Sequence, residues 1–206
     1  QLLVGLTATP ERMDGKDLRP DFGNRISAEI RLPQALQAGL LTPFQYLCIS
    51  DDTDLSDDSL WSGQKYNIER LADKLCAKTR ARLIVDALHK YLADEYTCRA
   101  LCFCVNKRHA DFMAEQLRLY GFNAQSLTSD TPADERKQLA KDLREGTLHY
   151  LCVVDIFNEG VDIPEVDTVL FLRPTESLTI FLQQLGRGLR LSAGKTELTV
   201  LDFVAQ

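Results

Sequence analysis

The chain has 206 residues, of which 45% are apolar and 26% charged, a balance typical of a globular domain that excludes a disordered or collagen-like chain. The formal net charge is −6, and five of the acids fall within residues 51–58, so the rest of the chain is close to neutral. A protein steered to nucleic acid by its overall field is usually basic, so we expect any nucleic-acid contact here to be a local patch or to involve residues outside the chain. No apolar run approaches the roughly 20 residues of a membrane span, and no membrane partner is expected.

The first half of the sequence predicts a short helix, a strand and a long helical region. The helix is expected over 33–38 and the strand over 44–50. The acidic stretch 51–58 is predicted to be a solvated loop, and Trp61 behind it to be anchored in the core. Over 67–91, apolar residues recur at spacings of three and four, which predicts helix.

From residue 100 onward, apolar strands and helices alternate, which indicates an α/β fold with a RecA-like parallel sheet and helices on both faces. Ligands of such sheets gather beyond the carboxyl ends of the strands, so the loops 105–108, 127–132, 155–165 and 173–177 and the helix after the last of them are the places to inspect. The predicted strands here are 100–105, 124–127, 150–155, 166–172 and 197–203, and the predicted helices are 109–120, 132–144 and 178–189. Ser129 or Thr131 is expected to cap the second of these helices.

The six cysteines form no CxxC pair, and the spacing of Cys102 and Cys104 puts both on one face of a strand. We therefore interpret them as buried thiols of a reducing compartment, with the cytoplasm as the expected location. A metal site would need ligand pairs that the sequence lacks.

The most specific motif is the string Gln183-Gln184-Leu185-Gly186-Arg187-Gly188-Leu189-Arg190. On a helix, its two arginines, three apart, share one face, and guanidinium groups fork onto phosphate oxygens. The glycines between them let another surface approach closely. The alternative is a helix end whose arginines balance the negative end of the helix dipole.

A second motif, Asp155-Ile156-Phe157-Asn158-Glu159-Gly160-Val161-Asp162-Ile163-Pro164, directly follows a predicted buried strand. Gly160 permits a backbone turn that other residues resist, and Asp162 stands where a carboxylate accepts hydrogen bonds from ribose hydroxyls. The alternative for Asp162 is a turn or capping role. A third string, Gly5-Leu6-Thr7-Ala8-Thr9-Pro10, is by itself compatible with an ordinary strand end.

In this order the three strings resemble motifs III, V and VI of the superfamily-2 ATP-dependent helicases, and Ala100–Ala110 resembles motif IV. The closest branch holds the excision-repair helicases and the motor subunits of type I and type III restriction enzymes, in which motif VI opens with Gln. The resemblance covers the chain from residue 1 to about 203.

This resemblance implies a motor with two RecA-like domains and ATP with Mg²⁺ in the cleft between them. Residues 1–43 are then expected to be the tail of the first domain, with motif III and the interdomain linker, and residues 44–206 the second domain. The implied partners are nucleic acid, expected to be DNA, and the first domain of the same protein.

The family also implies a role for each matched residue. Arg190 aligns with the arginine finger and Arg187 with its partner on the γ-phosphate, where such an arginine is worth about 10³–10⁵ in rate in related enzymes. Many relatives carry threonine just before the motif V aspartate, where this chain has Val153 and Val154, which puts that nucleic-acid contact in question. The other implied sites are Gly160, Asp162 and Gln183 at the nucleotide, Thr7 and Thr9 in coupling, and Val105, Asn106, Lys107, Thr128 and Ser129 along the nucleic acid.

Two further strings imitate nucleotide motifs and are rejected. Ala193-Gly194-Lys195-Thr196 lacks the earlier glycine of a phosphate-binding loop and precedes a strand, so it is predicted to be a turn. Asp94-Glu95 ends a helix and does not follow a buried strand. In this family the phosphate-binding loop and the magnesium carboxylates lie upstream, so we expect the chain alone not to hydrolyse ATP.

Two alternatives to an unwinding motor stay open at this stage. One is a restriction-type subunit that translocates on duplex DNA without unwinding it. The other is a regulatory RecA-like domain without motor function, against which the intact Gln183, Arg187 and Arg190 argue.

Overall fold

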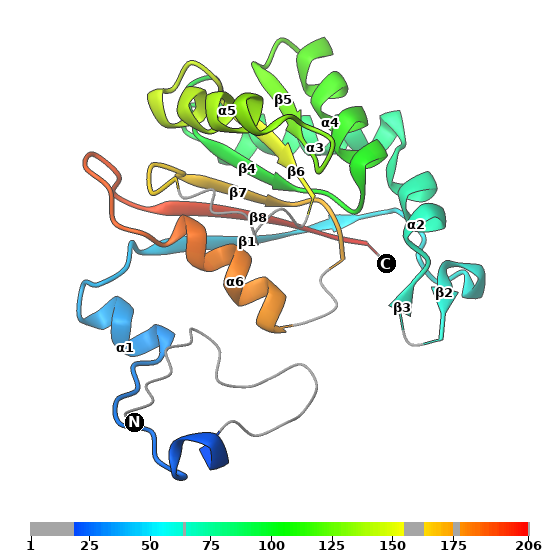
Figure 1. Cartoon of the computed structure of the whole chain (residues 1–206). Coiled ribbons are helices and arrows are strands. Elements are labelled where there is room, and N and C mark those ends of the chain that lie inside the picture. Colours follow the sequence, from blue (N-terminus) through cyan, green and yellow to red (C-terminus); the bar gives the residue numbers. More distant parts are fainter. Residues whose placement is uncertain (1–18, 64, 155–162, 175–177, 206) are drawn as a thin grey trace.

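A computed structural model of the chain describes residues 19–63, 65–154, 163–174 and 178–205. Its centre is a six-stranded sheet in the order β1-β8-β7-β4-β6-β5, in which all neighbours are parallel (Figure 1). Parallel neighbours require crossover connections, so all six strands begin at one edge of the sheet and end at the other. The strands are β1 (Phe44–Asp51), β4 (Ala100–Phe103), β5 (Ala124–Leu127), β6 (Tyr150–Val153), β7 (Thr168–Phe171) and β8 (Leu198–Ala205).

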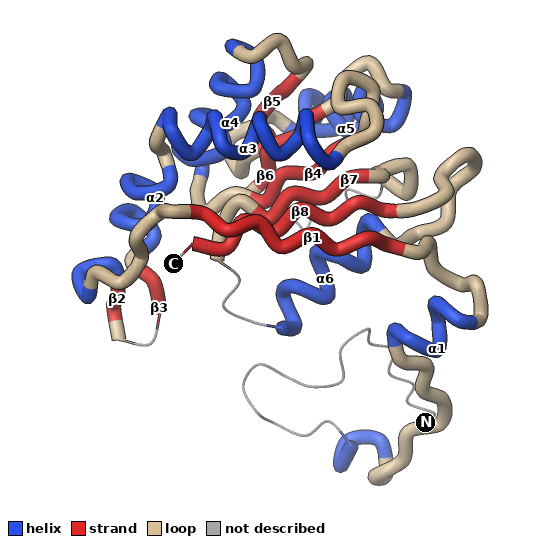
Figure 2. Tube along the Cα trace, turned by 180° about the vertical axis from the view of Figure 1, so that it is seen from behind, coloured by secondary structure: helices blue, strands red, loops and turns tan. Residues whose placement is uncertain are grey.

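Helices cover both faces of this sheet, which confirms the predicted RecA-like α/β fold (Figure 2). α3 and α4 pack on one face, and α5 and α6 on the other. Within the described ranges, no helix has the length and apolar character needed to cross a membrane. The α-helices are α1 (Leu32–Gln37), α2 (Ile68–Leu75), α3 (Lys78–Tyr91), α4 (Lys107–Leu119), α5 (Ala133–Glu145) and α6 (Leu178–Gly188), and two short 3₁₀ turns are η1 (Arg19–Phe22) and η2 (Asp58–Leu60).

Alternation along the central strands explains why they are apolar without a break. In β4, Ala100 and Cys102 point into the cluster with α3 and α4, and Leu101 and Phe103 into the cluster with α5 and α6. Cys104 lies in the same cluster as Cys102, as predicted. All six cysteines are free thiols, but the prediction that they are all buried is wrong for Cys48, which is exposed on the edge strand β1, and for Cys76, which is half-buried.

Two helix boundaries differ from the sequence prediction. The helical region 67–91 is two helices, and Asn67 caps the first of them by accepting a hydrogen bond from the Arg70 backbone N–H at 3.2 Å. The predicted cap of α5 is wrong, because Pro132 occupies the N-cap position without a side-chain bond. The Thr131 hydroxyl instead accepts from the Thr128 backbone N–H at 3.0 Å and closes the preceding loop.

The stretch from Asp51 to Trp61 is the main departure from prediction. Asp51 is buried at the end of β1 and is not part of a solvated loop. The prediction that Trp61 is anchored in the core is wrong, because Trp61 is 43% exposed; its neighbour Leu60, 2% exposed, is buried instead. Trp61 begins a small antiparallel hairpin, β2 (Trp61–Ser62) with β3 (Lys65–Tyr66), and its ring stacks on that of Tyr66 at a centroid distance of 4.2 Å.

Candidate functional site

The site residues fall on two opposite edges of the sheet. We call the edge at which the parallel strands end the carboxyl edge, and the edge at which they begin the amino edge. The loops after β4 and β5 leave the carboxyl edge. α6 starts after β7 at that edge and runs back to the start of β8, so its last turn, with Arg187, lies at the amino edge (Figure 1). Arg187 therefore does not share an edge with the loops after β4 and β5, which were among the places expected to hold a ligand.

At the carboxyl edge, the loops after β4 and β5 are joined by an ion pair. Lys107 Nζ donates to Asp130 Oδ1 at 2.6 Å, and both side chains are largely exposed. Asn106 caps α4, since its Oδ1 accepts from the His109 N–H at 3.0 Å, and its Nδ2 donates to Glu69 at 3.1 Å. The predicted nucleic-acid loops thus lie side by side.

The other predicted nucleic-acid residues of these loops differ in how exposed they are. Thr128 is 7% exposed, and its hydroxyl accepts from the Asp130 N–H at 3.3 Å. The Ser129 carbonyl accepts from Arg136 at 2.7 Å, while the residue itself is exposed. Val105 is 4% exposed and packs with the buried side chains around α2, so its side chain is not available to a ligand.

Beneath this edge lies a buried ion pair that the sequence did not reveal. Arg80 Nε donates to Asp51 Oδ2 at 2.5 Å, and Arg80 Nη1 donates to the Leu172 carbonyl at 3.2 Å, where β7 ends. Burial raises the pKa of the Asp51 carboxyl, but hydrogen bonds from Thr53 and the charge of Arg80 outweigh burial and hold that pKa below its usual value.

His109 belongs to the same buried region as Arg80. It is 0% exposed, and its Nδ1 accepts from the Val105 N–H at 3.3 Å. Burial, helped by the nearby charges of Arg80 and Arg108, lowers the pKa of His109 to about 3. The ring is therefore neutral at physiological pH and supports the loop that carries Asn106.

The two glycines of the arginine motif have different surroundings. A Cβ on Gly188 would stand 2.7 Å from Leu198 Cδ1 and 3.2 Å from Val169 Cγ2, so glycine lets the last turn of α6 lie close against β7 and β8. A Cβ on Gly186 would meet nothing within 4 Å in the described chain. Only Gly186 therefore leaves space for another surface.

The end of α6 is held by contacts from two other segments. The helix ends at Gly188, so Arg190 lies beyond it, and the prediction that both arginines share one helix face is corrected. The Thr42 backbone N–H donates to the Leu189 carbonyl at 2.8 Å, and the Thr42 hydroxyl donates to the Arg190 carbonyl at 2.9 Å. Lys195 Nζ donates to the Gly188 carbonyl at 2.5 Å and to the Arg190 carbonyl at 3.1 Å.

The same lysine reaches the end of the second motif. Lys195 Nζ donates to the Pro164 carbonyl at 3.1 Å, so the chain just before β7 lies beside the end of α6. Gln183 and Arg190 are exposed residues and Arg187 is half-buried. Thr7, Thr9, Gly160 and Asp162 lie outside the described residues.

The two strings that imitate nucleotide motifs lie where they were predicted, one in a turn and the other after a helix. Gly194, with φ +80°, and Lys195 form the expected turn before β8. Glu95 follows α3, and its carboxylate contacts His89 Nδ1 at 2.9 Å. No group of three or more His, Cys, Asp or Glu residues suited to a metal ion is found in the described ranges.

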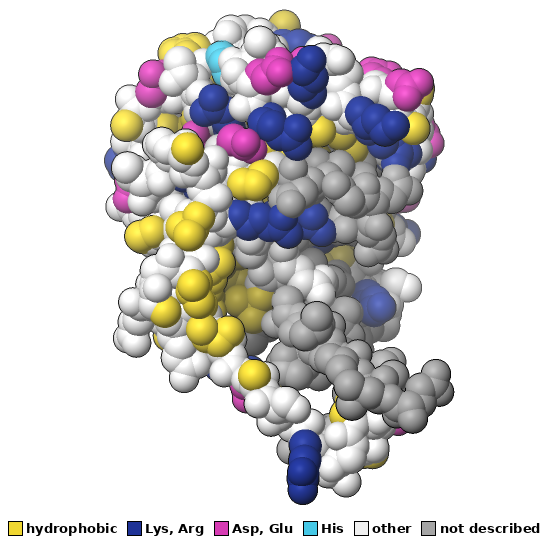
Figure 3. Space-filling model, turned by 60° about the vertical axis from the view of Figure 1, so that its left-hand side comes forward, with side chains coloured by type: hydrophobic (Ala, Val, Ile, Leu, Met, Phe, Trp, Pro, Cys, Tyr) yellow, Lys and Arg dark blue, Asp and Glu magenta, His cyan; other side chains and the backbone are white. Residues whose placement is uncertain are grey.

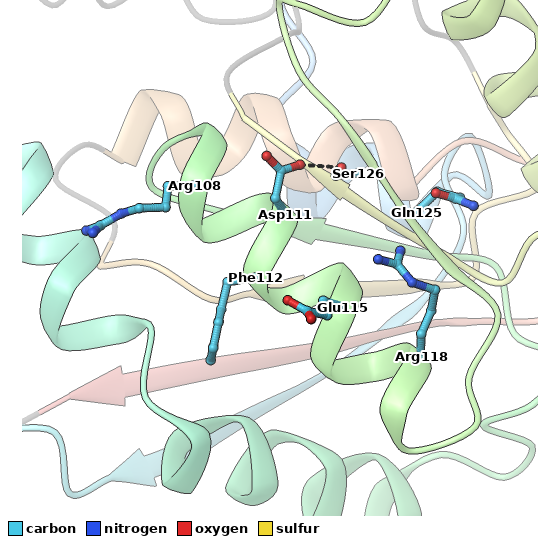
Figure 4. A pocket seen from close by; sticks show the side chains of 7 residues that line it. All are labelled: Arg108, Asp111, Phe112, Glu115, Arg118, Gln125 and Ser126. Atoms are coloured by element: carbon cyan, nitrogen blue, oxygen red, sulfur yellow. Dashed lines mark hydrogen bonds between the residues drawn. The ribbon is translucent and has the colours of Figure 1, made fainter.

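An open pocket of about 700 Å³ lies elsewhere, between α4 and the edge strand β5 (Figure 4). Its lining mixes arginines with acids, and Ser126 donates to Asp111 across it at 2.5 Å. It contains none of the predicted site residues. The lining residues are Arg108, Asp111, Phe112, Glu115, Arg118, Gln125 and Ser126.

The surface charge fits a local contact better than a global one. Figure 3 shows one face of the described surface, on which Lys and Arg side chains stand among Asp and Glu side chains. Together with the net charge of −6, this mixture gives no overall basic field, and the expectation that any nucleic-acid contact is a local patch or involves residues outside the chain stays a prediction.

Comparison with known proteins identifies the family. The model of the helicase conserved C-terminal domain matches residues 53–192, and the chain belongs to this family. It is 28% identical over 203 residues to a Saccharomyces cerevisiae protein provisionally named ATP-dependent helicase IRC3, covering 98% of this chain and 29% of that protein. It is also 28% identical over 171 residues to the Type I restriction enzyme EcoKI endonuclease subunit of Escherichia coli K12, covering 76% of this chain and 14% of the subunit.

Solved structures agree on the fold. A fragment from Vibrio vulnificus YJ016, provisionally described as an HsdR subunit of a type I restriction enzyme, matches with a TM-score of 0.74 at 24% identity, over 96% of this chain and 38% of that one. The DEAD-box protein SrmB of E. coli matches with a TM-score of 0.53 at 22% identity, over 79% of this chain and 78% of that one. The chain is thus a helicase conserved C-terminal domain with the fold of these structures, and it spans less than half the length of the curated relatives it matches.

Proposed function

We propose that this chain is the second motor domain of an ATP-dependent DNA helicase or translocase, in which Arg187 and Arg190 act on ATP held by a first RecA-like domain. The observation that carries the proposal is the anchoring of the Arg190 backbone by Thr42 and Lys195, which fixes where this side chain leaves the domain. Phosphoryl transfer spreads negative charge over the γ-phosphate oxygens, and a guanidinium group placed there stabilises that charge.

In this proposal the two edges of the sheet bind different ligands. The arginine end of α6 at the amino edge meets the nucleotide, together with Gln183, Gly160 and Asp162. Asn106, Lys107, Thr128 and Ser129 at the carboxyl edge contact the nucleic-acid backbone. An arginine delivered by one domain to ATP on another makes hydrolysis depend on closure of the cleft, and Thr7 and Thr9 would couple closure to movement.

We further propose that residues 1–43 belong to the first domain and the linker, and residues 44–206 to the second. ATP and Mg²⁺ are then bound mainly by the first domain, because the chain carries no GxxxxGK[ST] sequence. The chain alone is accordingly not expected to hydrolyse ATP, and a reducing compartment, proposed to be the cytoplasm, suits its six free thiols.

The test is ATP hydrolysis by the full-length protein with no nucleic acid, single-stranded DNA, duplex DNA or RNA. We expect DNA to stimulate hydrolysis several-fold and the purified chain alone to be inactive. Two results would contradict the motor proposal and favour a regulatory domain. One is ATP hydrolysis by the full-length protein that no nucleic acid stimulates, and the other is no ATP hydrolysis under any of these conditions.

A duplex translocase is the second candidate, and the similarity to the EcoKI subunit favours it. A strand-displacement assay beside a triplex-displacement assay separates the two motors. Displacement of a paired strand indicates unwinding, and displacement of only the third strand of a triplex indicates translocation on intact duplex.

A further inference from the structure

The side chain of Lys195 binds backbone carbonyls of both the second motif and the arginine motif, although the residue itself lies in a turn. Its ammonium group has three N–H donors, and three carbonyls lie within hydrogen-bond distance, those of Pro164 at 3.1 Å, Gly188 at 2.5 Å and Arg190 at 3.1 Å. The Gly188 carbonyl belongs to the end of α6, where the helix dipole is negative and a cation is favoured, and the Arg190 carbonyl follows two residues beyond it. All donors of one side chain are thus used to join two motifs.

We propose that Lys195 is a positioning residue for hydrolysis, which locks the arginine end of α6 against the segment before β7. The inference rests on the proposed function of Arg187 and Arg190. Among the described residues, the hydrogen bonds of Lys195 Nζ go to backbone carbonyls, so it acts by fixing where the two arginines leave the domain, together with the Thr42 hydroxyl on the Arg190 carbonyl.

The surroundings of Lys195 make this lock sensitive to pH. Burial lowers the pKa of Lys195 to about 8, against the opposing charges of Asp167 and Glu165. Glu165 is itself near Arg144, at 3.7 Å. Above pH 8 the neutral amine keeps two N–H donors for three carbonyls and loses its attraction to the helix dipole.

Stability and activity should then respond to pH in opposite directions. Because the folded pKa of Lys195 lies below its usual value of 10.5, the unfolded chain binds more protons between pH 8 and 10.5, and the contribution of this group to stability rises over that range. A fall of kcat above pH 8 that comes from Lys195 would therefore not be accompanied by unfolding.

The experiment measures kcat and KM for ATP in the full-length protein from pH 6.5 to 9.5, for wild type and Lys195→Met, Lys195→Arg and Thr42→Val. Lys195→Met is expected to lower kcat about 10–100-fold with KM nearly unchanged, since small misplacements of a catalytic group have effects of this size. Lys195→Arg, which keeps its charge, should retain most of the activity at pH 7 and lose the alkaline fall of kcat. Thr42→Val, which keeps the backbone bond to Leu189, should show a smaller loss of kcat.

Two controls make the outcome decisive. Lys141→Met alters an exposed lysine that pairs only weakly with Glu145 at 3.8 Å and should leave kcat unchanged. Amide hydrogen exchange of residues 185–190 should quicken in Lys195→Met, while the rest of the domain keeps its protection. If Lys195→Met fails to fold, Thr42→Val and the pH profile of Lys195→Arg still decide.

The inference is overturned if Lys195→Met keeps the wild-type kcat while Arg190→Ala loses it, or if the alkaline fall persists unchanged in Lys195→Arg. If Arg190→Ala also keeps the wild-type kcat, the proposed function of the arginines fails instead. The two failures are thus distinguishable.

Discussion

Replacing Gly188 with alanine tests the packing that holds the arginine helix on the sheet. The new Cβ would stand 2.7 and 2.8 Å from the two Cδ atoms of Leu198 and 3.2 Å from Val169 Cγ2, and both neighbours are fully buried. Overpacking of this kind costs about 1–3 kcal/mol. Alanine returns less than about 1 kcal/mol of helix propensity at this last helical position, so we expect a net loss of about 1–2 kcal/mol.

Gly186→Ala is the matched control, two residues earlier on the same helix. Its Cβ would meet nothing within 4 Å in the described chain, so the gain in helix propensity of up to about 1 kcal/mol is not opposed. The fold should be as stable as wild type or slightly more stable. Hydrolysis by the full-length protein should nevertheless fall, because we propose that the open face of Gly186 packs against the first domain.

Thermal unfolding of the chain and ATP hydrolysis by the full-length protein measure the two effects. For a domain of this size 1 kcal/mol corresponds to about 2–4 °C in Tm. Gly188→Ala should lower Tm by several degrees, and Gly186→Ala should not lower it. An unchanged Tm in Gly188→Ala would refute the packing argument, and wild-type hydrolysis in Gly186→Ala would refute the contact with the first domain.

Three further predictions concern the carboxyl edge. Arg80→Met leaves Asp51 charged and buried, and urea denaturation should show a loss of about 3–5 kcal/mol, whereas a loss below about 1 kcal/mol would contradict the buried pair. His109 has a folded pKa of about 3, so the stability it contributes is lost as pH falls from about 6.5 toward 3. His109→Gln should therefore make the urea midpoint depend less on pH over that range. A pH dependence equal to that of wild type would count against the assignment. Lys107→Met breaks an exposed pair with Asp130 and should change stability by less than about 1 kcal/mol. It should nevertheless weaken DNA binding by the full-length protein and make that affinity less dependent on salt. DNA binding equal to wild type at all salt concentrations would contradict the proposed contact of Lys107.

The second half of the fold was predictable because local signals and tertiary structure agree there. The strand over 124–127 and the helix that ends before Gly121 were found where their patterns placed them, since buried strands read as apolar runs and Gly121 has a φ of +89°. The hairpin at Trp61 was missed because two-residue strands leave no periodic pattern.

The site was predictable only where a local pattern of side chains marks it in the sequence. Asp51 read as one of several solvated acids, because its partner Arg80 lies 29 residues away and no local pattern joins them. Lys195 was dismissed as a turn residue, since the three carbonyls it binds are backbone groups that any sequence has. Because β7 and β8 are parallel, α6 runs back to the edge at which the strands begin, and this carries Arg187 away from the carboxyl edge where ligands were expected.

The central claim is that Arg190 acts in the chemical step on ATP, and single-turnover hydrolysis beside equilibrium ATP binding tests it most directly. In the full-length protein, Arg190→Ala should bind ATP with nearly wild-type affinity and hydrolyse it about 10³-fold more slowly or worse. Arg82→Ala, at an exposed arginine of α3, is the control and should match wild type in both measurements. Hydrolysis by Arg190→Ala at the wild-type rate would contradict the account.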